Sequence, residues 1–394
     1  MHNFVLENPT KILFGRDTIN HIGTETRAFG ATALLVYGRQ SLKENGIHGQ
    51  IIEALAASDI TVVEHGGVKS NPVLSHVRQG IALCKAHGVD VIVAAGGGSV
   101  IDEAKAIAAG AVVAHDVWKF FKGKAGITTP LPICTVLTLA ASGSEMNGGM
   151  VITNDETNLK LGIGNKKLCP KVSILDPTVT FSVPQNYTAY GAVDAIAHTL
   201  EFYFTATDPY TPVQDRFIEG LIMNLIEACD QVLIDPKSYS GRANLMWCAT
   251  MALNGWTAAG LGPIGFPMHM IEHAMSALYD VPHGAGLSVV IPAWLRWRAA
   301  RAPHKIAQLA ERVFMITEGS IEEKAHTGID RLHGWFKQIH SPTTLTELTI
   351  PETAINTLAT HSLTQAKLWR LDDYDTATIE EILRFAVGSV TPSH

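Results

Sequence analysis

Short runs rich in β-branched residues alternate with helical stretches in the first half of the chain, and this alternation constrains the fold most. The runs carry too few polar positions to be strands with one face in water. Strands buried on both faces and separated by helices indicate a parallel sheet that helices cover. The predicted strands are Ala33 to Tyr37, Asp59 to Glu64, Val89 to Ala95 and Ile133 to Leu137, and the predicted helices are Leu74 to His87 and Ser99 to Gly110.

The character of the chain changes near Asp176-Pro177, and from Ala189 onward the apolar residues recur with a helical period. The length of 394 residues also favours two domains, because single cores stop growing near about 250–300 residues. We predict a Rossmann-like α/β domain over residues 1–180, an all-α domain over residues 181–394 and a binding cleft between them. The clearest helical stretches of the second domain are Asp215 to Leu233, Ala243 to Ala258 and Glu311 to Ile339.

The composition excludes several classes of protein. With 46% hydrophobic and 17% charged residues, the chain is expected to form a large buried core. The net charge of −7 argues against a nucleic-acid partner. The five cysteines are widely spaced and read as buried free thiols. The sequence shows neither a signal peptide nor an apolar run of about 18 residues, so we expect a cytoplasmic protein without a membrane segment.

A glycine-rich turn, Gly96-Gly97-Gly98-Ser99, follows the third predicted strand and opens a helix. Glycines allow close approach of a ligand, and the free N–H groups of a helix N-terminus attract a pyrophosphate. The turn departs from the G-x-G-x-x-G pattern, so it is not a standard Rossmann fingerprint. The alternative interpretation is a tight turn with a capping box made by Ser99 and Asp102.

A second candidate site follows the first predicted strand, at Gly38, Arg39, Gln40 and Ser41. NAD enzymes usually place an acid near this position to hold the ribose 2′-hydroxyl, whereas a cation suits the 2′-phosphate of NADP. No acid occurs here before Glu44, and Arg39 therefore favours NADP(H). The alternative is that Arg39 is an ordinary solvated loop residue.

A third candidate segment, Thr138 to Asn147, follows the fourth predicted strand. It is rich in small hydroxyl residues that can hydrogen-bond a phosphate or a ribose. Taken alone this signal is weak, because loops of serine and glycine are common.

Histidines cluster in the second half of the chain. Asp194 and His198 are four residues apart, so they share one helix face. His269 and His273 repeat that spacing, and His283 follows a proline that would turn the chain back. One Asp with two or three His can fill the coordination shell of a divalent transition metal. The alternative is a set of ordinary core histidines; a zinc-protease H-E-x-x-H motif does not fit the order of the residues.

The sequence resembles the iron-containing (group III) alcohol dehydrogenases along essentially its whole length. The glycine turn and the two histidine segments carry the resemblance together. It also extends over Pro9 to Gly15, Leu175-Asp176-Pro177, Gly191 to Glu201 and Pro282-His283-Gly284. Gln214 to Phe217, Arg242 to Trp247 and Phe314 to Gly319 are similar to the branch of NADPH-dependent butanol dehydrogenases and broad-range aldehyde reductases.

The resemblance implies a dehydroquinate synthase-like fold, a homodimer, and one divalent metal, Fe²⁺ or Zn²⁺, held by Asp194, His198, His269 and His283. His273 matches a histidine near the metal and the nicotinamide that is not a usual ligand. Together with the turns described above, the candidate cofactor-binding residues are Gly38, Arg39, Gln40, Ser41, Asn71, Gly97, Gly98, Ser99, Asp102, Thr138, Leu139, Ser142, Ser144, Asn147, Lys160 and Val179.

The expected function is hydride transfer between NADP(H) and a small, largely apolar primary alcohol or aldehyde, because alanines and other apolar residues surround both metal motifs. His273 is a candidate proton relay, since an unperturbed imidazole has a pKa near neutrality, and a water relay is the alternative. The rival functions are a dehydroquinate synthase-type lyase, a glycerol dehydrogenase-type enzyme and a metal-stabilised scaffold without catalysis.

Overall fold

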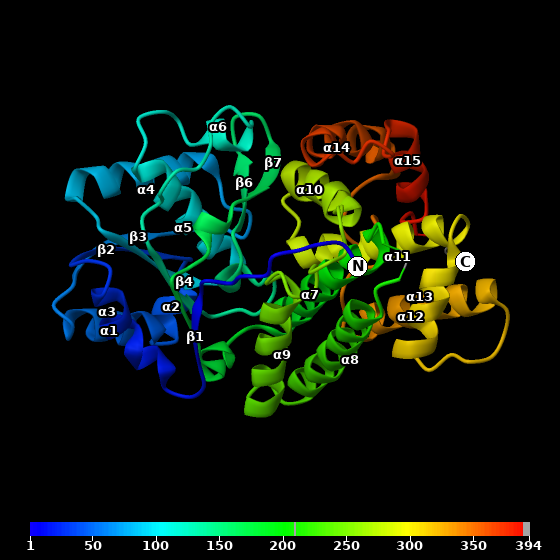
Figure 1. The fold of residues 1–394 in the computed structure, drawn as a ribbon, viewed down its shortest axis with the longest axis horizontal. Coiled ribbons are helices and arrows are strands. Elements are labelled where there is room, and N and C mark those ends of the chain that lie inside the picture. The colour runs from blue at the N-terminus through cyan, green and yellow to red at the C-terminus, as the bar shows by residue number, and fades with distance from the viewer. Residues whose placement is uncertain (209, 389–394) are drawn as a thin grey trace.

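The computed structural model describes residues 1–208 and 210–388, and its first half is built on one parallel sheet (Figure 1). Six strands pair in the order β1-β8-β5-β4-β2-β3, and every pairing is parallel. The predicted α/β half is therefore confirmed. The strands are β1 (Lys11–Phe14), β2 (Thr32–Tyr37), β3 (Thr61–Gly66), β4 (Val91–Gly96), β5 (Ile133–Leu137) and β8 (Val172–Leu175).

Helices cover both faces of the sheet, as the apolar strands require. Leu35 and Val93 face one apolar cluster together with Ile51 of α3, while Leu34 and Ile92 face another. Figure 1 shows the two layers on opposite sides of the strands. The first layer contains α1 (Ile22–Arg27), α2 (Ser41–Glu44) and α3 (Ile47–Ala56), and the second contains α4 (Leu74–His87), α5 (Gly98–Ala111) and α6 (Trp118–Phe121).

The strand order reverses between β2 and β4, because the chain runs outward from β2 to β3 and then returns to the other side of β2. In open parallel sheets, ligands bind in the crevice outside the carboxyl ends of the strands at such a switch point. Gly38 follows β2 and Gly97 follows β4, so two of the three predicted cofactor segments flank this crevice.

A two-stranded antiparallel hairpin, which the sequence did not predict, joins the two halves of the molecule. Its strands are β6 (Gly149–Asn154) and β7 (Leu159–Gly164), and β7 packs against α10 (Pro267–Tyr279) of the helical half. Trp369 Nε1 donates to the carbonyl of Gly162 at 3.0 Å, and Gly162 N donates to Gln365 Oε1 at 3.1 Å. These bonds tie the hairpin to α14 (Ile355–Trp369).

The remainder of the described chain is helical, and it confirms an all-α second half. Two of the predicted stretches are wrong in extent. The helix predicted to continue to Ala258 ends at Ala252, before a turn in which Gly255 has φ 98°. The stretch from Glu311 to Ile339 is two helices, separated where Met315 and Gly319 take left-handed φ values and Ser320 starts a capping box. The helices are α7 (Gln185–Thr205), α8 (Pro212–Ile234), α9 (Tyr239–Ala252), α10 (Pro267–Tyr279), α11 (His283–Ala299), α12 (Pro303–Val313), α13 (Ile321–Gln338), α14 (Ile355–Trp369) and α15 (Thr376–Arg384).

None of the helices in the described residues is both long enough and apolar enough to cross a membrane. The last strand of the sheet ends at Leu175, close to the predicted boundary at residue 180. That boundary stays a prediction about folding units, since a change in secondary structure alone does not define a domain.

Candidate metal centre and dinucleotide cleft

Three helices bring the predicted metal ligands together. Asp194 lies on α7, which is buried along most of its length, and His198 follows one turn later. α10 ends at Tyr279, and the left-handed residue Asp280 reverses the chain so that His283 begins α11. Helices α7 and α11 can approach closely because Gly284 has no Cβ. A Cβ at this position would lie 2.1 Å from a backbone oxygen of α7.

Three imidazoles converge on one carboxylate oxygen. Asp194 Oδ1 lies 3.5 Å from His198 Nδ1, 3.7 Å from His269 Nε2 and 3.6 Å from His283 Nε2. Asp194 Oδ1, His198 Nδ1 and His269 Nε2 are buried and make no hydrogen bond with the described part of the chain. Leaving buried polar atoms unpaired costs about 1–3 kcal/mol each. A cation among these atoms would satisfy them, so the donor set fits a divalent transition metal.

Two further carboxylates hold the imidazoles in place. Glu201 Oε1 accepts a hydrogen bond from His269 Nδ1 at 3.0 Å and another from the His269 backbone N–H at 2.9 Å. Glu272 Oε2 accepts from His283 Nδ1. A proton held on Nδ1 leaves the Nε2 lone pair of each ring free to bind a metal. Glu201 and Glu272 are therefore functional candidates that the sequence did not assign, although both lie inside the quoted motifs.

The protonation of the cluster reflects its burial and its charges. Burial alone would raise the pKa of Asp194, but His198, His269 and His283 lower it well below its usual range. Burial lowers the pKa of His198 to about 3. For His269 burial acts in the same direction, yet the neighbouring carboxylates of Asp194 and Glu201 outweigh it and raise the pKa to about 9. In the absence of a metal, His269 therefore carries the proton of the site at neutral pH.

His273 lies against the cluster, with its ring centroid 5.6 Å from that of His283 and 5.5 Å from that of Trp369. Burial, followed by the charges of Lys160, His283 and His269, lowers the pKa of His273 well below its usual range. A buried site among cations disfavours the imidazolium, so a relay through His273 stays a prediction beside the water relay. Its Nδ1 is buried and has no hydrogen-bond partner in the described residues.

The glycine turn and the Thr138 to Asn147 loop form one unit on the other side of the cleft. A Cβ at Gly98 would lie 2.1 Å from Ser142 Oγ, so the glycine is required for this contact. Thr138 N donates to the carbonyl of Gly96 at 3.1 Å. Ser144 Oγ donates to Asp102 Oδ1 at 2.5 Å. Two segments that are about forty residues apart in the sequence thus form one rigid wall of the crevice.

The alternative interpretation of this turn, a capping box made by Ser99 and Asp102, does not match the structure. Helix α5 begins at Gly98 with Gly97 as its N-cap, and no side chain caps it. Ser99 Oγ instead donates to the carbonyl of Ser70 at 2.5 Å, and Asp102 Oδ2 accepts from Val151 N at 2.9 Å. Both side chains bond to neighbouring segments, so no side chain of the described residues accepts a hydrogen bond as a cap from the N–H groups that open the helix.

Lys105, one turn after Asp102, is fully buried behind the glycine turn and was not singled out from the sequence. Its Nζ donates to Ser144 Oγ at 2.7 Å, to Asn147 Oδ1 at 3.3 Å and to the carbonyl of Gly149 at 2.7 Å. Burial lowers the pKa of Lys105 to about 8. Lys105 therefore fastens the loop and strand β6 to the helix that carries the turn.

A polar chain links the cofactor side to the metal side. Lys160 Nζ donates to Asn71 Oδ1 at 3.0 Å and lies 3.6 Å from Glu272 Oε2. Asn71 Nδ2 donates to Asp280 Oδ1 at 2.8 Å, across the two halves of the molecule. These two predicted cofactor residues therefore lie together, next to a carboxylate that holds His283.

The other predicted cofactor residues lie at the end of β2 and in the core of the α/β half. Gly38 borders the switch point, while Arg39, Gln40 and Ser41 are exposed at the end of β2. Val179 is buried in the apolar cluster beneath β8, so its contribution is to the core of the α/β half.

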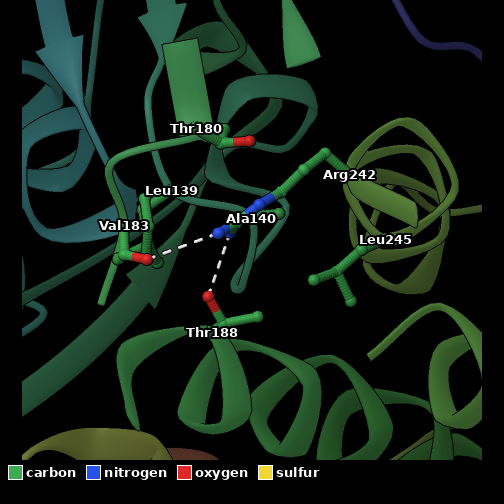
Figure 2. A pocket seen from close by; sticks show the side chains of 7 residues that line it. All are labelled: Leu139, Ala140, Thr180, Val183, Thr188, Arg242 and Leu245. Atoms are coloured by element: carbon green, nitrogen blue, oxygen red, sulfur yellow. Dashed lines mark hydrogen bonds between the residues drawn. The ribbon is translucent and has the colours of Figure 1, made fainter. Parts of the chain in front are cut away.

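A small pocket lies where the Thr138 to Asn147 loop meets the helical half (Figure 2). Leu139, a predicted cofactor residue, lines it together with Arg242 of α9. Arg242 donates from Nη1 to Thr188 Oγ1 at 3.0 Å and from Nη2 to the carbonyl of Val183 at 3.3 Å, as Figure 2 shows. This buried guanidinium ties α9 to the segment that leads into α7.

Comparison with known proteins agrees with this arrangement. Residues 9–177 match the family described as iron-containing alcohol dehydrogenase, and residues 188–387 match the C-terminal domain of the Fe-containing alcohol dehydrogenase family. The chain belongs to the iron-containing alcohol dehydrogenase family. It is an oxidoreductase of this family, and the two matched regions contain the glycine turn and the cluster of Asp194 with the histidines, respectively.

Similar members of the family include the probable NADH-dependent butanol dehydrogenase 1 of Bacillus subtilis, which is 41% identical over 98% of this chain and 99% of its own length. The NADPH-dependent aldehyde reductase YqhD of Escherichia coli is 36% identical over 93% of this chain and 95% of its own length. The crystal structure of NADH-dependent butanol dehydrogenase A from Thermotoga maritima superposes with a TM-score of 0.94 at 41% identity, covering 98% and 99% of the two chains. The dehydroquinate synthase-like fold implied by the sequence is thereby confirmed.

Proposed function

We propose that this alcohol dehydrogenase transfers hydride between NADP(H) and small, largely apolar primary alcohols or aldehydes at a metal held by Asp194, His198, His269 and His283. The convergence of three imidazoles on Asp194 Oδ1 carries the proposal. Family membership favours iron as the metal. Zn²⁺ suits the same nitrogen and oxygen donors.

The chemistry is divided between the bound groups and the protein. A metal at this site supplies Lewis acidity toward the oxygen of an alcohol or aldehyde. The nicotinamide supplies or accepts the hydride. Asp194 balances the charge of the cation, and Glu201 and Glu272 fix the orientation of His269 and His283.

His273 stays neutral at this position, so its buried Nδ1 provides a hydrogen-bonding group rather than a strong acid. A substrate hydroxyl or a water next to Nδ1 would satisfy this unpaired nitrogen. We propose that His273 orients the substrate oxygen and that the proton leaves through His273 or an adjacent water.

Aromatic rings make the surroundings of the cluster apolar. The Phe266 ring lies 5.6 Å from that of His269 and 5.8 Å from that of Trp369, between ring centroids. Both rings are half-buried. A wall of this kind excludes water from a small substrate. It favours butanal-sized substrates, and family membership favours the dehydrogenase over the dehydroquinate synthase-type lyase.

The preference for NADP(H) rests on the end of β2. Arg39 is exposed there, and the segment carries no acid that would repel a 2′-phosphate. Five of the similar proteins are named NADH-dependent, whereas the aldehyde reductase YqhD is named NADPH-dependent, so this chain's own residues must decide its preference.

We propose a cytoplasmic homodimer, and the exposed N-terminal segment supports the dimer. Phe4, Val5 and Leu6 extend over the surface, and Val5 is 95% exposed. Apolar side chains in an extended segment suit pairing with a second copy of the chain. Sedimentation of the wild type and of a Val5→Glu variant tests this, with a dimer that dissociates in the variant as the expected result.

A substrate panel tests the proposed activity. Protein purified without oxygen is assayed with NADPH and NADH against butanal and dihydroxyacetone. We expect NADPH to be consumed fastest with butanal. Greater kcat/KM with dihydroxyacetone would favour the glycerol dehydrogenase-type alternative, and no nicotinamide oxidation with either carbonyl compound would contradict the proposal.

A further inference from the structure

A second histidine–carboxylate cluster lies in the α/β half, on elements that hold no ligand of the first. His65 is the buried residue of β3, His76 lies on the first turn of α4, and Glu103 lies on α5. Glu103 Oε1 is 3.2 Å from His65 Nε2 and 2.6 Å from His76 Nδ1. Because three different elements supply these side chains, tertiary packing rather than local sequence gathers them.

Only one of the two carboxylate oxygens of Glu103 takes part in these contacts. The side chain is fully buried, both imidazoles bond to Oε1, and Oε2 has no hydrogen-bond partner in the described chain. Burial would raise the pKa of Glu103, but His65 and His76 outweigh it and lower the pKa, so the carboxylate is ionised. An ionised buried carboxylate with a free oxygen is a position where a cation is stabilising.

The geometry repeats that of the first cluster. The rings of His198 and His269 have centroids 4.5 Å apart with planes at 31°. The rings of His65 and His76 have centroids 4.0 Å apart with planes at 21°. In each cluster, one buried carboxylate and two imidazoles offer ligand atoms within 4.8 Å of one another.

We propose that His65, His76 and Glu103 form a second binding site for a divalent metal of the Zn²⁺ type. Two imidazoles and one carboxylate are a ligand set that zinc sites use, with a fourth position left for water. The His76 side chain is 20% exposed, which provides a path from solvent to that position. The nearby cation Lys69 is exposed, so solvent screens its repulsion of the metal.

The site lies directly behind the dinucleotide turn. Glu103 follows Asp102, and the loop between His65 and His76 contains Ser70, whose carbonyl accepts the Ser99 hydroxyl. A metal bridging β3, α4 and α5 would fix this loop against the helix that carries the turn. The second site is thus structural, and it is separate from the metal of the proposed reaction.

Metal stoichiometry tests the proposal on the full-length protein. The metal-free wild type is titrated with Zn²⁺ in competition with a chromophoric chelator, and Co²⁺ titration provides an independent absorption spectrum. We expect two equivalents in the wild type, one in the His269→Ala variant and one in the Glu103→Gln variant. The His76→Gln variant should weaken the second site by at least about tenfold.

The control is His87→Gln, an exposed histidine on the same helix α4, which should leave both sites unchanged. Circular dichroism of each variant verifies folding, and His76→Gln replaces Glu103→Gln if the buried substitution unfolds the protein. A wild type that takes up one equivalent, lost in His269→Ala, would overturn the second site while leaving the first intact. A second equivalent that survives in both Glu103→Gln and His76→Gln would overturn it as well.

Discussion

Glu201→Gln isolates the contribution of a residue that touches a proposed ligand without being one. The Glu201 carboxylate is fully buried and accepts two hydrogen bonds from His269, at 3.0 Å from Nδ1 and 2.9 Å from the backbone N–H. Glutamine keeps the shape and one acceptor oxygen, but it loses the negative charge. The substitution therefore tests charge-assisted orientation of the imidazole rather than packing.

The expected magnitude follows from the kind of bond that is weakened. Hydrogen bonds with a charged partner contribute about 1.5–3 kcal/mol, against about 0.5–1.5 kcal/mol for neutral ones. The difference of about 1–1.5 kcal/mol corresponds to roughly a 10-fold loss of metal affinity, the lower end of the range of about 10–100-fold for residues behind metal ligands. We expect the loss in Zn²⁺ affinity and in kcat, with little change in the KM for NADPH.

Chelator competition gives the affinity, and Glu219→Gln is the matched control. Glu219 is also a buried glutamate of the helical half, but its partners are Tyr203 and Arg312. Glu219→Gln should lower thermal stability without changing metal affinity. Wild-type affinity in Glu201→Gln, or an equal loss in Glu219→Gln, would refute the reasoning.

Three further outcomes follow from the cleft and the cluster. Arg39→Asp should raise the KM for NADPH by about 10–100-fold while improving use of NADH. Arg27→Asp, at an exposed position on α1, should change neither. An unchanged preference for NADPH over NADH in Arg39→Asp would contradict the 2′-phosphate assignment. Gly98→Ala places a Cβ 2.1 Å from Ser142 Oγ, so it should lower the free energy of unfolding by about 1–3 kcal/mol and weaken NADPH binding. The double variant Gly98→Ala/Ser142→Gly should recover both properties. Gly49→Ala, where a Cβ meets nothing, should lose neither. The pKa of metal-free His269 is about 9, so Zn²⁺ must displace a proton from this ring at lower pH. The apparent Zn²⁺ affinity should therefore fall about tenfold per pH unit from pH 8 to 6.5. An affinity that does not change with pH would be inconsistent with His269 as a ligand.

The strands and most helices of the α/β half could be predicted because buried β-branched runs and helical periods are local signals. β5 coincides with the predicted Ile133 to Leu137, and α4 with Leu74 to His87. The β6–β7 hairpin gave no comparable signal, since its alternation is short and Gly149, Gly162 and Gly164 interrupt it. The break between α12 and α13 was missed because apolar residues keep a helical period on both sides of it.

The clustering of Asp194, His198, His269 and His283 was predictable from the helical spacing of two motifs and from the family resemblance. The supporting residues were not, because their roles depend on which helix packs beside them. Glu201 lies in the same motif as His198 but bonds to a histidine on another helix. Lys105 reads as an ordinary helix residue until the fold places three oxygens around its Nζ. Ser99 looked like a helix cap because a sequence does not show that its neighbour is Ser70.

The metal requirement of NADPH-dependent aldehyde reduction can be measured most directly by comparing wild type with His269→Ala, both purified without oxygen. Bound metal and turnover of butanal are determined on the same samples, and His87→Gln, at an exposed position on α4, serves as a variant outside both clusters. We expect His269→Ala to lose the catalytic metal and turnover together, while His87→Gln retains both. Full NADPH-dependent activity in the His269→Ala protein would contradict the assignment of the centre.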